Sequence, residues 1–322
     1  KEAVNMLNNF KTKNAPLFFI LAVFIILQSV YLLSPADLWW DASVYLGMGK
    51  YAFSAGKSGL WEPSRALAWP LVLGILWKIG ANPVLFGSII TIGLSAACIL
   101  LTYMVSRNFF DDTTSLIAAL FTAFSPTLFL FTSVLQSEIP SLFFLLLGAY
   151  LFLRKKFVAS GFIFGISFMT RFFTVFAVIP FFVELIRLVI RQKSSKKFLA
   201  FTLSFLIPLS FYLILNQIIY SNAVYPFMLQ LFMTQATGSV FNQPFSFYLI
   251  GLFKENIFVI FSVLGICSLI RKNHAKNILI LPVMLIAFIP FALVSHKEMR
   301  FLLPLMPFLY IITAYGITSF FK

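Results

Sequence analysis

The sequence predicts an all-α polytopic membrane protein, and composition and segment length both lead to this class. Hydrophobic residues make up 61% of the 322 residues and charged residues only 11%, whereas an ordinary soluble domain carries about a quarter charged residues. The apolar runs are about 15–25 residues long, which is close to what a hydrocarbon core of ~30 Å requires of an α-helix. No segment alternates at period two, as the strands of a membrane barrel would.

About ten transmembrane helices are expected, with no soluble domain, so that residues 1–322 form a single transmembrane domain. Residues 34–83 form a first outer loop with juxtamembrane helices, and residues 221–254 form a second outer loop. The predicted spans cover residues 16–33, 84–106, 115–133, 139–153, 157–170, 174–190, 198–220, 255–270, 278–294 and 301–321.

The apolar stretch 66–79 decides the topology, because counting it as a span reverses the side of every later loop. If it does not span and the N-terminus is cytoplasmic, the basic clusters at 154–156, 191–197 and 271–276 all lie in the cytoplasm, as the positive-inside rule requires. We therefore expect 66–79 to lie in the outer interface and both termini to be cytoplasmic. The membrane is a cell membrane or one of the endoplasmic-reticulum type. The net charge of +14 is then explained by basic loops and implies no nucleic-acid partner.

The same topology gathers charges of both signs at segment ends on the outer face. A charge held against a bilayer costs several kcal/mol unless it faces water or a partner, so this set predicts a polar cavity. Its members are Asp37, Asp41, Glu62, Arg65, Glu138, Arg171, Glu255, His296, Lys297, Glu298 and Arg300.

In the first outer loop, Asp41 and Tyr45 lie four residues apart and so share one face of a short helix expected to run to Phe53. Asp41 is a candidate general base, since partial desolvation raises the basicity of a carboxylate. It could equally cap the start of that helix. Arg65 could hold a phosphate or a sugar, or extend toward the lipid headgroups.

Two later segment ends carry single charges. Glu138 is either a second carboxylate of the cavity or an acid favoured by the helix dipole. Arg171 is the only charged residue between Phe157 and Phe182. An isolated arginine at this depth requires an anionic partner, and a lipid phosphate would supply one.

The densest cluster is His296–Arg300. On a helical turn His296 and Arg300 would lie four apart and Lys297 and Arg300 three apart, so these cations are expected to converge on one anion. The alternative is a charge belt at the membrane interface.

The chain contains no Gly-rich phosphate loop and no paired-histidine metal motif, so neither a nucleotide nor a metal is expected as a required cofactor. A divalent cation, if one binds, would lie between Asp41 and Glu138.

Three segments resemble motifs of the GT-C glycosyltransferases, the polytopic class that uses polyprenyl-phosphate sugar donors. Segment 40–45 (Trp-Asp-Ala-Ser-Val-Tyr) resembles the acidic motif of their first loop, and segment 65–70 (Arg-Ala-Leu-Ala-Trp-Pro) resembles the arginine-to-proline stretch that follows it. Segment 296–301 (His-Lys-Glu-Met-Arg-Phe), with Pro304 and Pro307 after it, is similar to the motif of the family 22 mannosyltransferases. Glu138 and Arg171 stand where protein O-mannosyltransferase and aminoarabinose-transferase relatives place polar groups.

The resemblance implies an inverting transferase that moves a sugar, with mannose the first expectation, from a polyprenyl- or dolichyl-phosphate donor to an acceptor hydroxyl on the extracytoplasmic face. The acceptor would be a glycolipid, a lipid-linked glycan or a protein, and membrane lipids surround the site. Asp41 would be the base. The implied ligands of the donor phosphate are Arg171, His296, Lys297 and Arg300, and those of the sugar or acceptor are Tyr45, Arg65, Glu138 and Glu298.

Two other functions fit part of the pattern. A transporter or flippase of lipid-linked sugars would need the same cations but no base, and the absence of an inverted repeat in the sequence argues against it. A scaffold without chemistry leaves the charges on one face without an explanation.

Overall fold

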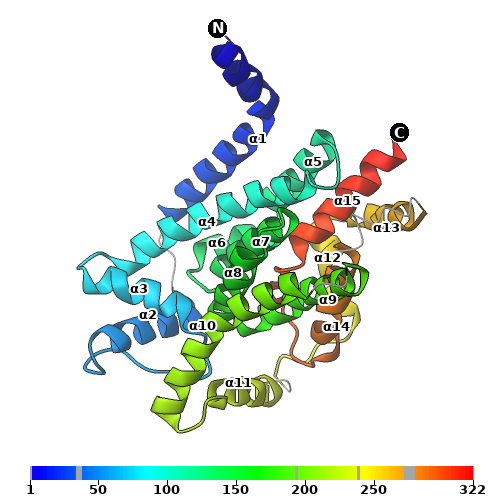
Figure 1. The fold of residues 1–322 in the computed structure, drawn as a ribbon. Coiled ribbons are helices and arrows are strands. Elements are labelled where there is room, and N and C mark those ends of the chain that lie inside the picture. The colour runs from blue at the N-terminus through cyan, green and yellow to red at the C-terminus, as the bar shows by residue number, and fades with distance from the viewer. Residues whose placement is uncertain (1, 34–37, 193–194, 238–239, 272–279, 322) are drawn as a thin grey trace.

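The computed structural model describes residues 2–33, 38–192, 195–237, 240–271 and 280–321 (Figure 1). All regular elements within these ranges are helical, with short 3-10 turns at Phe172–Thr174, Ile257–Ile260 and Met299–Leu302. The α-helices are α1 (Glu2–Leu32), α2 (Trp40–Phe53), α3 (Ala68–Lys78), α4 (Pro83–Ser106), α5 (Asp112–Ala123), α6 (Pro126–Ser133), α7 (Glu138–Leu153), α8 (Phe157–Thr170), α9 (Val175–Gln192), α10 (Lys196–Tyr220), α11 (Tyr225–Ala236), α12 (Ser246–Glu255), α13 (Phe261–Arg271), α14 (Ile280–Leu293) and α15 (Met306–Phe320).

The predicted class, an all-α polytopic membrane protein, is confirmed in the described residues. Four helical segments there are long and apolar enough to cross a membrane, namely Ala15–Leu32, Pro83–Ser106, Phe172–Arg191 and Lys196–Tyr220. The bent pair α5 and α6 would make a fifth, and five shorter apolar helices accompany them. Each of the ten predicted spans contains at least one observed helix, although residues 278–279 of one span lie outside the described residues.

Two predicted spans differ from the observed helices because of proline. Span 115–133 is broken into α5 and α6, which meet at an angle of 51°, since Pro126 cannot donate the backbone hydrogen bond that would continue α5. Ser125 caps α6 by accepting a hydrogen bond from the Leu128 amide. Span 301–321 becomes helical only at Met306, with Pro307 in its first turn.

The first outer loop forms a small unit at one end of the bundle. Figure 1 shows α2 and α3 side by side next to the beginning of α4. Gly49 and Gly74 allow the close approach, because a Cβ atom on Gly49 would lie 2.6 Å from the Pro70 carbonyl oxygen. The 11-residue helix α3 is about 16 Å long at 1.5 Å per residue, roughly half the hydrocarbon thickness, so it is too short to span. Residues 34–37 of this loop, including Asp37, lie outside the described residues.

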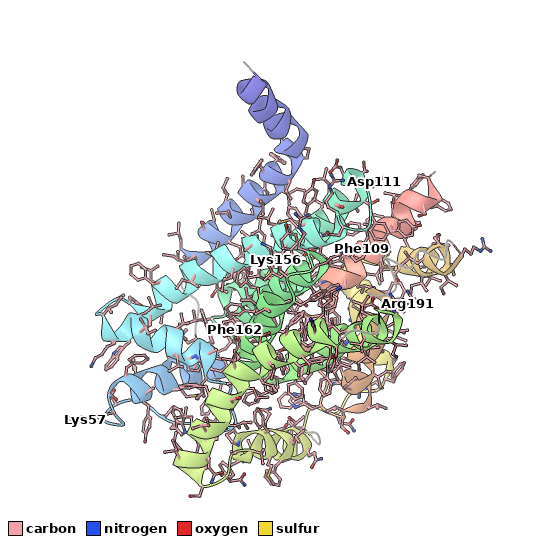
Figure 2. All side chains as sticks on the ribbon, in the orientation of Figure 1. Lys57, Phe109, Asp111, Lys156, Phe162 and Arg191 are labelled. Carbon is pink, nitrogen blue, oxygen red and sulfur yellow. The ribbon has the colours of Figure 1, made fainter. Side chains whose placement is uncertain are left out.

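Aromatic side chains fill the space between the central helices (Figure 2). Phe164 on α8 contacts Phe181 on α9, with ring centroids 4.7 Å apart, and Phe201 on α10 at 5.9 Å. All three rings are buried. Helices α8 and α10 cross at Gly161, where a Cβ atom would lie 2.2 Å from the Phe201 carbonyl oxygen. This crossing fixes the position of the end of α8, where Arg171 begins the next segment.

Replacing Gly161 with alanine should therefore force α8 and α10 apart. We expect Gly161→Ala to lower the free energy of unfolding by about 1–3 kcal/mol, the usual cost of overpacking, as measured by denaturant titration in detergent. The matched control is Gly93→Ala on α4, where a Cβ atom meets nothing within 4 Å. That variant should be neutral or gain up to about 1 kcal/mol from helix propensity, and equal losses in both variants would contradict the packing argument.

Candidate active site

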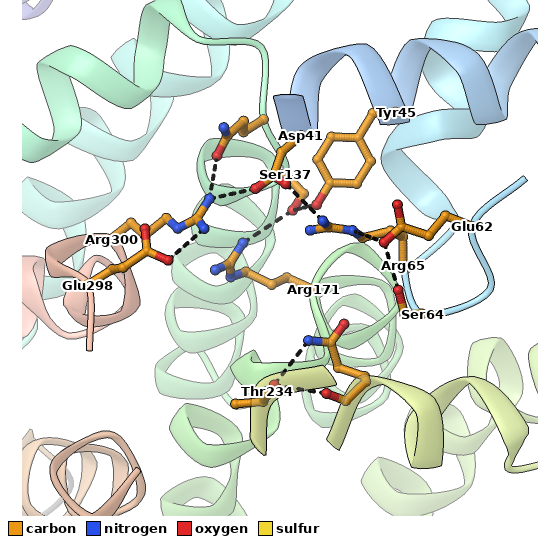
Figure 3. Close-up of polar contacts among 12 residues, drawn as sticks. Asp41, Tyr45, Glu62, Ser64, Arg65, Ser137, Arg171, Thr234, Glu298 and Arg300 are labelled. Atoms are coloured by element: carbon orange, nitrogen blue, oxygen red, sulfur yellow. Dashed lines mark hydrogen bonds and ion pairs between the residues drawn. The ribbon is translucent and has the colours of Figure 1, made fainter. Parts of the chain in front are cut away.

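Most of the charged residues that the sequence singles out line one cavity of about 710 Å³, namely Asp41, Glu62, Arg65, Arg171, His296, Glu298 and Arg300. Glu255 does not line it, and its carboxylate accepts hydrogen bonds from Ser125 and Thr127. The walls of the cavity come from α2, the loop before α3, the loop before α7, the end of α8, α11 and the segment before α15. Figure 3 shows Asp41 between Arg300 and Arg65, with Arg171 facing Ser137. The polar residues that line it are Asp41, Tyr45, Glu62, Ser64, Arg65, Gln136, Ser137, Thr170, Arg171, Gln230, Thr234, Thr237, His296, Glu298 and Arg300.

Asp41 is held by two arginines. Its Oδ1 accepts a hydrogen bond from Nη2 of Arg65 at 2.8 Å, and its Oδ2 accepts one from Nη1 of Arg300 at 2.7 Å. The capping residue of α2 is Trp39, which makes no side-chain capping bond. The alternative that Asp41 caps this helix is therefore wrong, and its carboxylate belongs to the cavity.

The two arginines also set the charge of Asp41. Burial by itself raises the pKa of this carboxyl, but Arg65, then Arg300 and Arg171, together outweigh burial and hold the pKa below its ordinary value of 3.8. The expectation that desolvation makes Asp41 more basic is thus wrong for the site in this state. Asp41 is an ionised but weak base for as long as both arginines remain on it.

Arg65 joins three neighbours in the cavity instead of extending into the headgroups. Besides Asp41, its Nε donates to Oε1 of Glu62 at 2.9 Å, and its guanidinium lies 5.8 Å from the centre of the Tyr45 ring. The Tyr45 hydroxyl shares a hydrogen bond of 3.0 Å with Ser137. One face of α2 therefore presents both Asp41 and Tyr45 to the cavity, as their spacing predicts.

Arg171 has an internal partner. Its Nη1 lies 2.7 Å from Oε1 of Glu138, whose side chain is 1% exposed. The backbone turns from α8 into an extended conformation at Arg171, with φ at −157° and ψ at 116°, and this directs the side chain toward the beginning of α7. Glu138 lies behind the cavity wall and not on its surface, so the predicted contact between Glu138 and a sugar is not available in this geometry. Its carboxylate positions Arg171 instead.

The segment His296–Arg300 is not a helical turn, and this corrects the sequence-based expectation. His296 pairs with Asn242 in an isolated β-bridge, the Lys297 amide donates to the Phe241 carbonyl, and the Gln243 amide donates to the Ser295 carbonyl. These hydrogen bonds to the second outer loop keep the segment extended until the 3-10 turn that begins at Met299.

In this extended segment alternate side chains face the cavity. His296 Nε2 lies 2.7 Å from Oε1 of Glu298, and Nη2 of Arg300 donates to the same oxygen at 2.8 Å. Lys297 points away, because its Nζ donates to the Val294 carbonyl at 2.7 Å and the residue does not line the cavity. His296 and Arg300 thus converge on Glu298, and the expectation that Lys297 joins them is wrong for this state.

Several cavity residues carry no recognisable signal in the sequence. Gln136 accepts a hydrogen bond from Nη1 of Arg300 at 3.0 Å, and Gln230 and Thr234 reach the cavity from α11. Single amides and hydroxyls in apolar surroundings are common, so only the three-dimensional structure identifies them. The predicted second outer loop lines the site through α11 and Phe241, although its sequence contains no motif.

The arginines of the cavity are balanced by carboxylates. Arg65 pairs with Asp41 and Glu62, Arg171 with Glu138, and Arg300 with Asp41, Glu138 and Glu298. An incoming anion therefore competes with these carboxylates for the arginines. In the described part of the chain no three His, Cys, Asp or Glu side chains are placed to hold a metal ion, and a divalent cation between Asp41 and Glu138 stays a prediction.

Comparison with known proteins identifies the fold. Residues 64–220 match the family model described as dolichyl-phosphate-mannose-protein mannosyltransferase, a segment that contains Arg65, Glu138 and Arg171. No curated protein sequence matches the chain significantly.

Solved structures match over nearly the whole chain. ArnT from Cupriavidus metallidurans, bound to undecaprenyl phosphate, matches with a TM-score of 0.74 and 12% identity over 95% of this chain and 60% of ArnT. The archaeal oligosaccharyltransferase AglB from Archaeoglobus fulgidus, in complex with an inhibitory peptide and a dolichol-phosphate, matches with a TM-score of 0.59 and 14% identity over 95% of this chain and 50% of AglB. This chain thus spans between half and two thirds of their length. The predicted likeness to the GT-C glycosyltransferases is confirmed, and the chain has their membrane fold.

The buried pair of Arg171 and Glu138 predicts a specific pattern of stability. Removing one partner of a buried ion pair typically costs about 3–5 kcal/mol because it leaves the other charge uncompensated. Because Arg300 also lies 3.6 Å from Glu138 and compensates part of its charge, we expect Arg171→Gln to lose the lower part of this range in denaturant unfolding, and the double variant Arg171→Gln/Glu138→Gln to recover a large part of the loss. Losses that add in the double variant would show that the two side chains act independently.

The charges around Asp41 predict how its pKa responds to a mutation. Arg65 is the largest of the charges that oppose burial, so Arg65→Gln should raise the pKa of Asp41, whereas Lys57→Gln, at an exposed residue, should leave it unchanged. The carboxyl carbon can be followed by NMR with ¹³C-labelled aspartate and assigned with Asp41→Asn. An unchanged titration in Arg65→Gln would remove Arg65 as the cause.

Proposed function

We propose that this chain is an integral-membrane inverting glycosyltransferase that moves a sugar from a polyprenyl- or dolichyl-phosphate donor to an acceptor hydroxyl on the extracytoplasmic face. Mannose is the first sugar to test, because the matched family is named for dolichyl-phosphate-mannose. The observation that carries the proposal is the ionised carboxylate of Asp41, held between Arg65 and Arg300 inside the cavity.

The donor phosphate would be bound by Arg171, Arg300 and His296. The guanidinium carbons of Arg171 and Arg300 lie 5.8 and 5.7 Å from the centre of the Phe301 ring, and both groups reach Oε1 of Glu138, at 2.7 and 3.6 Å. Two guanidinium groups held in this way can bind one phosphate with charge-assisted hydrogen bonds. As the bond from the anomeric carbon to the phosphate oxygen breaks, negative charge develops on the departing phosphate, and prearranged cations stabilise that charge.

Donor binding would also activate the base. When the phosphate takes Arg300, Asp41 loses one of its two partners while it stays buried, so its pKa rises. The carboxylate can then accept the proton of the acceptor hydroxyl as that oxygen attacks the anomeric carbon from the face opposite the phosphate. The order of binding thus prevents an active base from forming before the donor is in place.

The remaining predicted residues take supporting parts. Burial raises the pKa of the Tyr45 phenol, which therefore stays protonated, and Tyr45, Arg65 and Glu298 are placed to contact the sugar or acceptor. Glu138 acts through Arg171. Lys297, which donates to the Val294 carbonyl, would position the segment that carries Arg300.

A lipid-linked donor also fits the surroundings of the cavity. An apolar cavity of about 500 Å³ adjoins it and shares Phe173 and Thr234 with it. Phe176, Phe291 and Leu231 line this second cavity, from α9, α14 and α11. The prenyl chain would lie there with its phosphate at the arginines.

The same arrangement supports an assignment of the membrane sides. Both predicted outer loops contribute to one cavity, through α2 and α11, so they would lie on one side, and the basic clusters at 154–156, 191–197 and 271–276 favour the other side as the cytoplasm. We therefore place both loops on the extracytoplasmic side and both termini in the cytoplasm. The acceptor would be a glycolipid, a lipid-linked glycan or a protein.

The direct test is transfer by purified protein in lipid, supplied with radiolabelled polyprenyl-phosphate-mannose and a membrane extract as acceptor. Asp41→Asn should reduce the rate by about 10²–10⁴-fold, the usual contribution of a general base. The matched control is Asp112→Asn, since Asp112 pairs with Arg107 far from the cavity, and it should keep full transfer.

Two outcomes would contradict the proposal. Equal transfer by the parent and by Asp41→Asn would remove Asp41 as the base. Donor binding without transfer, together with movement of the donor between leaflets in a scrambling assay, would indicate a flippase.

A further inference from the structure

A further cavity, an open groove, lies at the end of α8 that is opposite Arg171. It measures about 710 Å³, is open to the surface, and lies between the beginnings of α8 and α10. The 14 residues of α8 separate it from the candidate active site by about 21 Å along the helix. In Figure 2 Lys156 and Phe162 mark this region, away from Lys57 at the end that carries α2.

The mouth of this groove is strongly basic. Lys155, Lys156, Lys196 and Lys197 all line it, and among the described residues no carboxylate forms an ion pair with Lys155, Lys156 or Lys196. Lys155 occupies the left-handed region, with φ at 59°, at the tight turn between α7 and α8, a position that usually favours glycine.

The first turns of α8 and α10 both line this groove. The capping residues Lys156 of α8 and Ser195 of α10 make no side-chain capping bond, and neither helix has an acidic residue in its first turn. Positive charge at a helix N-terminus is unfavourable, because the helix dipole is already positive there. An anion bound among the lysines would remove this repulsion and accept hydrogen bonds from the free backbone N–H groups.

The wall behind the lysines is apolar and exposed. Val158, Phe162 and Ile207 line the groove with 60%, 40% and 59% of their surface accessible. Val158 and Phe162 belong to α8 and Ile207 to α10. The close crossing of these two helices at Gly161 keeps the two sides of the groove at a fixed separation. A basic mouth above an apolar wall that faces lipid is complementary to an amphiphile with an anionic head and a hydrocarbon chain.

We propose that this groove binds an anionic phospholipid, with the headgroup phosphate among the four lysines and one acyl chain along Val158, Phe162 and Ile207. The lysines argue for a phospholipid headgroup over the phosphate of the donor. Arginine is the residue that grips a phosphate in a bidentate manner, and lysine acts as a strongly hydrated point charge. The candidate active site contains three arginines, whereas no arginine lines this groove.

Quenching of a tryptophan placed in the groove tests the proposal. The five native tryptophans lie in or next to α2 and α3, at the other end of the bundle. They are Trp39, Trp40, Trp61, Trp69 and Trp77. Phe162→Trp adds one in the groove, and subtracting the signal of the parent protein isolates it. The protein is reconstituted in phosphatidylcholine with rising fractions of phosphatidylglycerol whose acyl chains are brominated, or of brominated phosphatidylcholine as the neutral probe.

Brominated phosphatidylglycerol should reduce the fluorescence of the groove tryptophan by half at a mole fraction about tenfold lower than the mole fraction of brominated phosphatidylcholine that has the same effect. Each basic residue near an anionic surface contributes about fivefold in affinity, so adding Lys156→Gln and Lys196→Gln should remove most of this preference. The control pair Arg154→Gln and Arg191→Gln removes two charges near the same end of the bundle without touching the groove lining, and it should keep the preference.

Equal quenching by both lipids would overturn the proposal. So would a preference that survives the lysine substitutions, or one that the arginine control loses to the same extent, since that result would show attraction by the general surface charge and not by this groove. Sugar transfer should be retained in all of these variants, so failure of this site is distinguishable from failure of the proposed activity.

Discussion

The ion pairs of Asp41 join parts of the chain that are remote in sequence. Arg65 is 24 residues from Asp41 and Arg300 is 259 residues away, yet each donates to a different oxygen of the same carboxylate. Taking charges out of water costs several kcal/mol per ion, so none of the three side chains can remain at this depth without the others. Neutralisation of Asp41 is thus the constraint that brings α2, the loop before α3 and the segment before α15 to one cavity.

The same constraint determines how the site can work. An anion that enters a cavity whose arginines are already paired competes with the carboxylates that hold them. Glu298 and Glu138 keep Arg300 and Arg171 in place while the site is empty. A donor phosphate that displaces carboxylates from these arginines changes the charge around Asp41 at the same step. Binding and activation of the base are then one event, and an acceptor that arrives first meets only a weak base.

Sequence reasoning predicts the membrane class, most helix positions and the meeting of Asp41, Tyr45, Arg65, Arg171 and Arg300, because apolar length and the cost of unpaired charge are local properties. It fails where a distant segment decides the conformation. His296 and Lys297 stand four and three residues before Arg300, the spacing of a helical turn, but hydrogen bonds to Phe241 and Gln243 hold this segment extended. The carboxylate partners of the arginines, and the amide of Gln136, likewise depend on contacts between remote residues that no local pattern contains.

In the proposed mechanism Asp41 competes with the donor phosphate for Arg300, and this competition can be measured by the binding of a donor lipid. Trp39 and Trp40 line the cavity, so binding of undecaprenyl phosphate can be followed by their fluorescence in the parent and in Asp41→Asn. We expect Asp41→Asn to bind this lipid about tenfold more tightly, since the charged competitor for the Arg300 guanidinium is gone. Equal or weaker binding by the variant would show that Asp41 does not compete with the phosphate and would contradict the exchange.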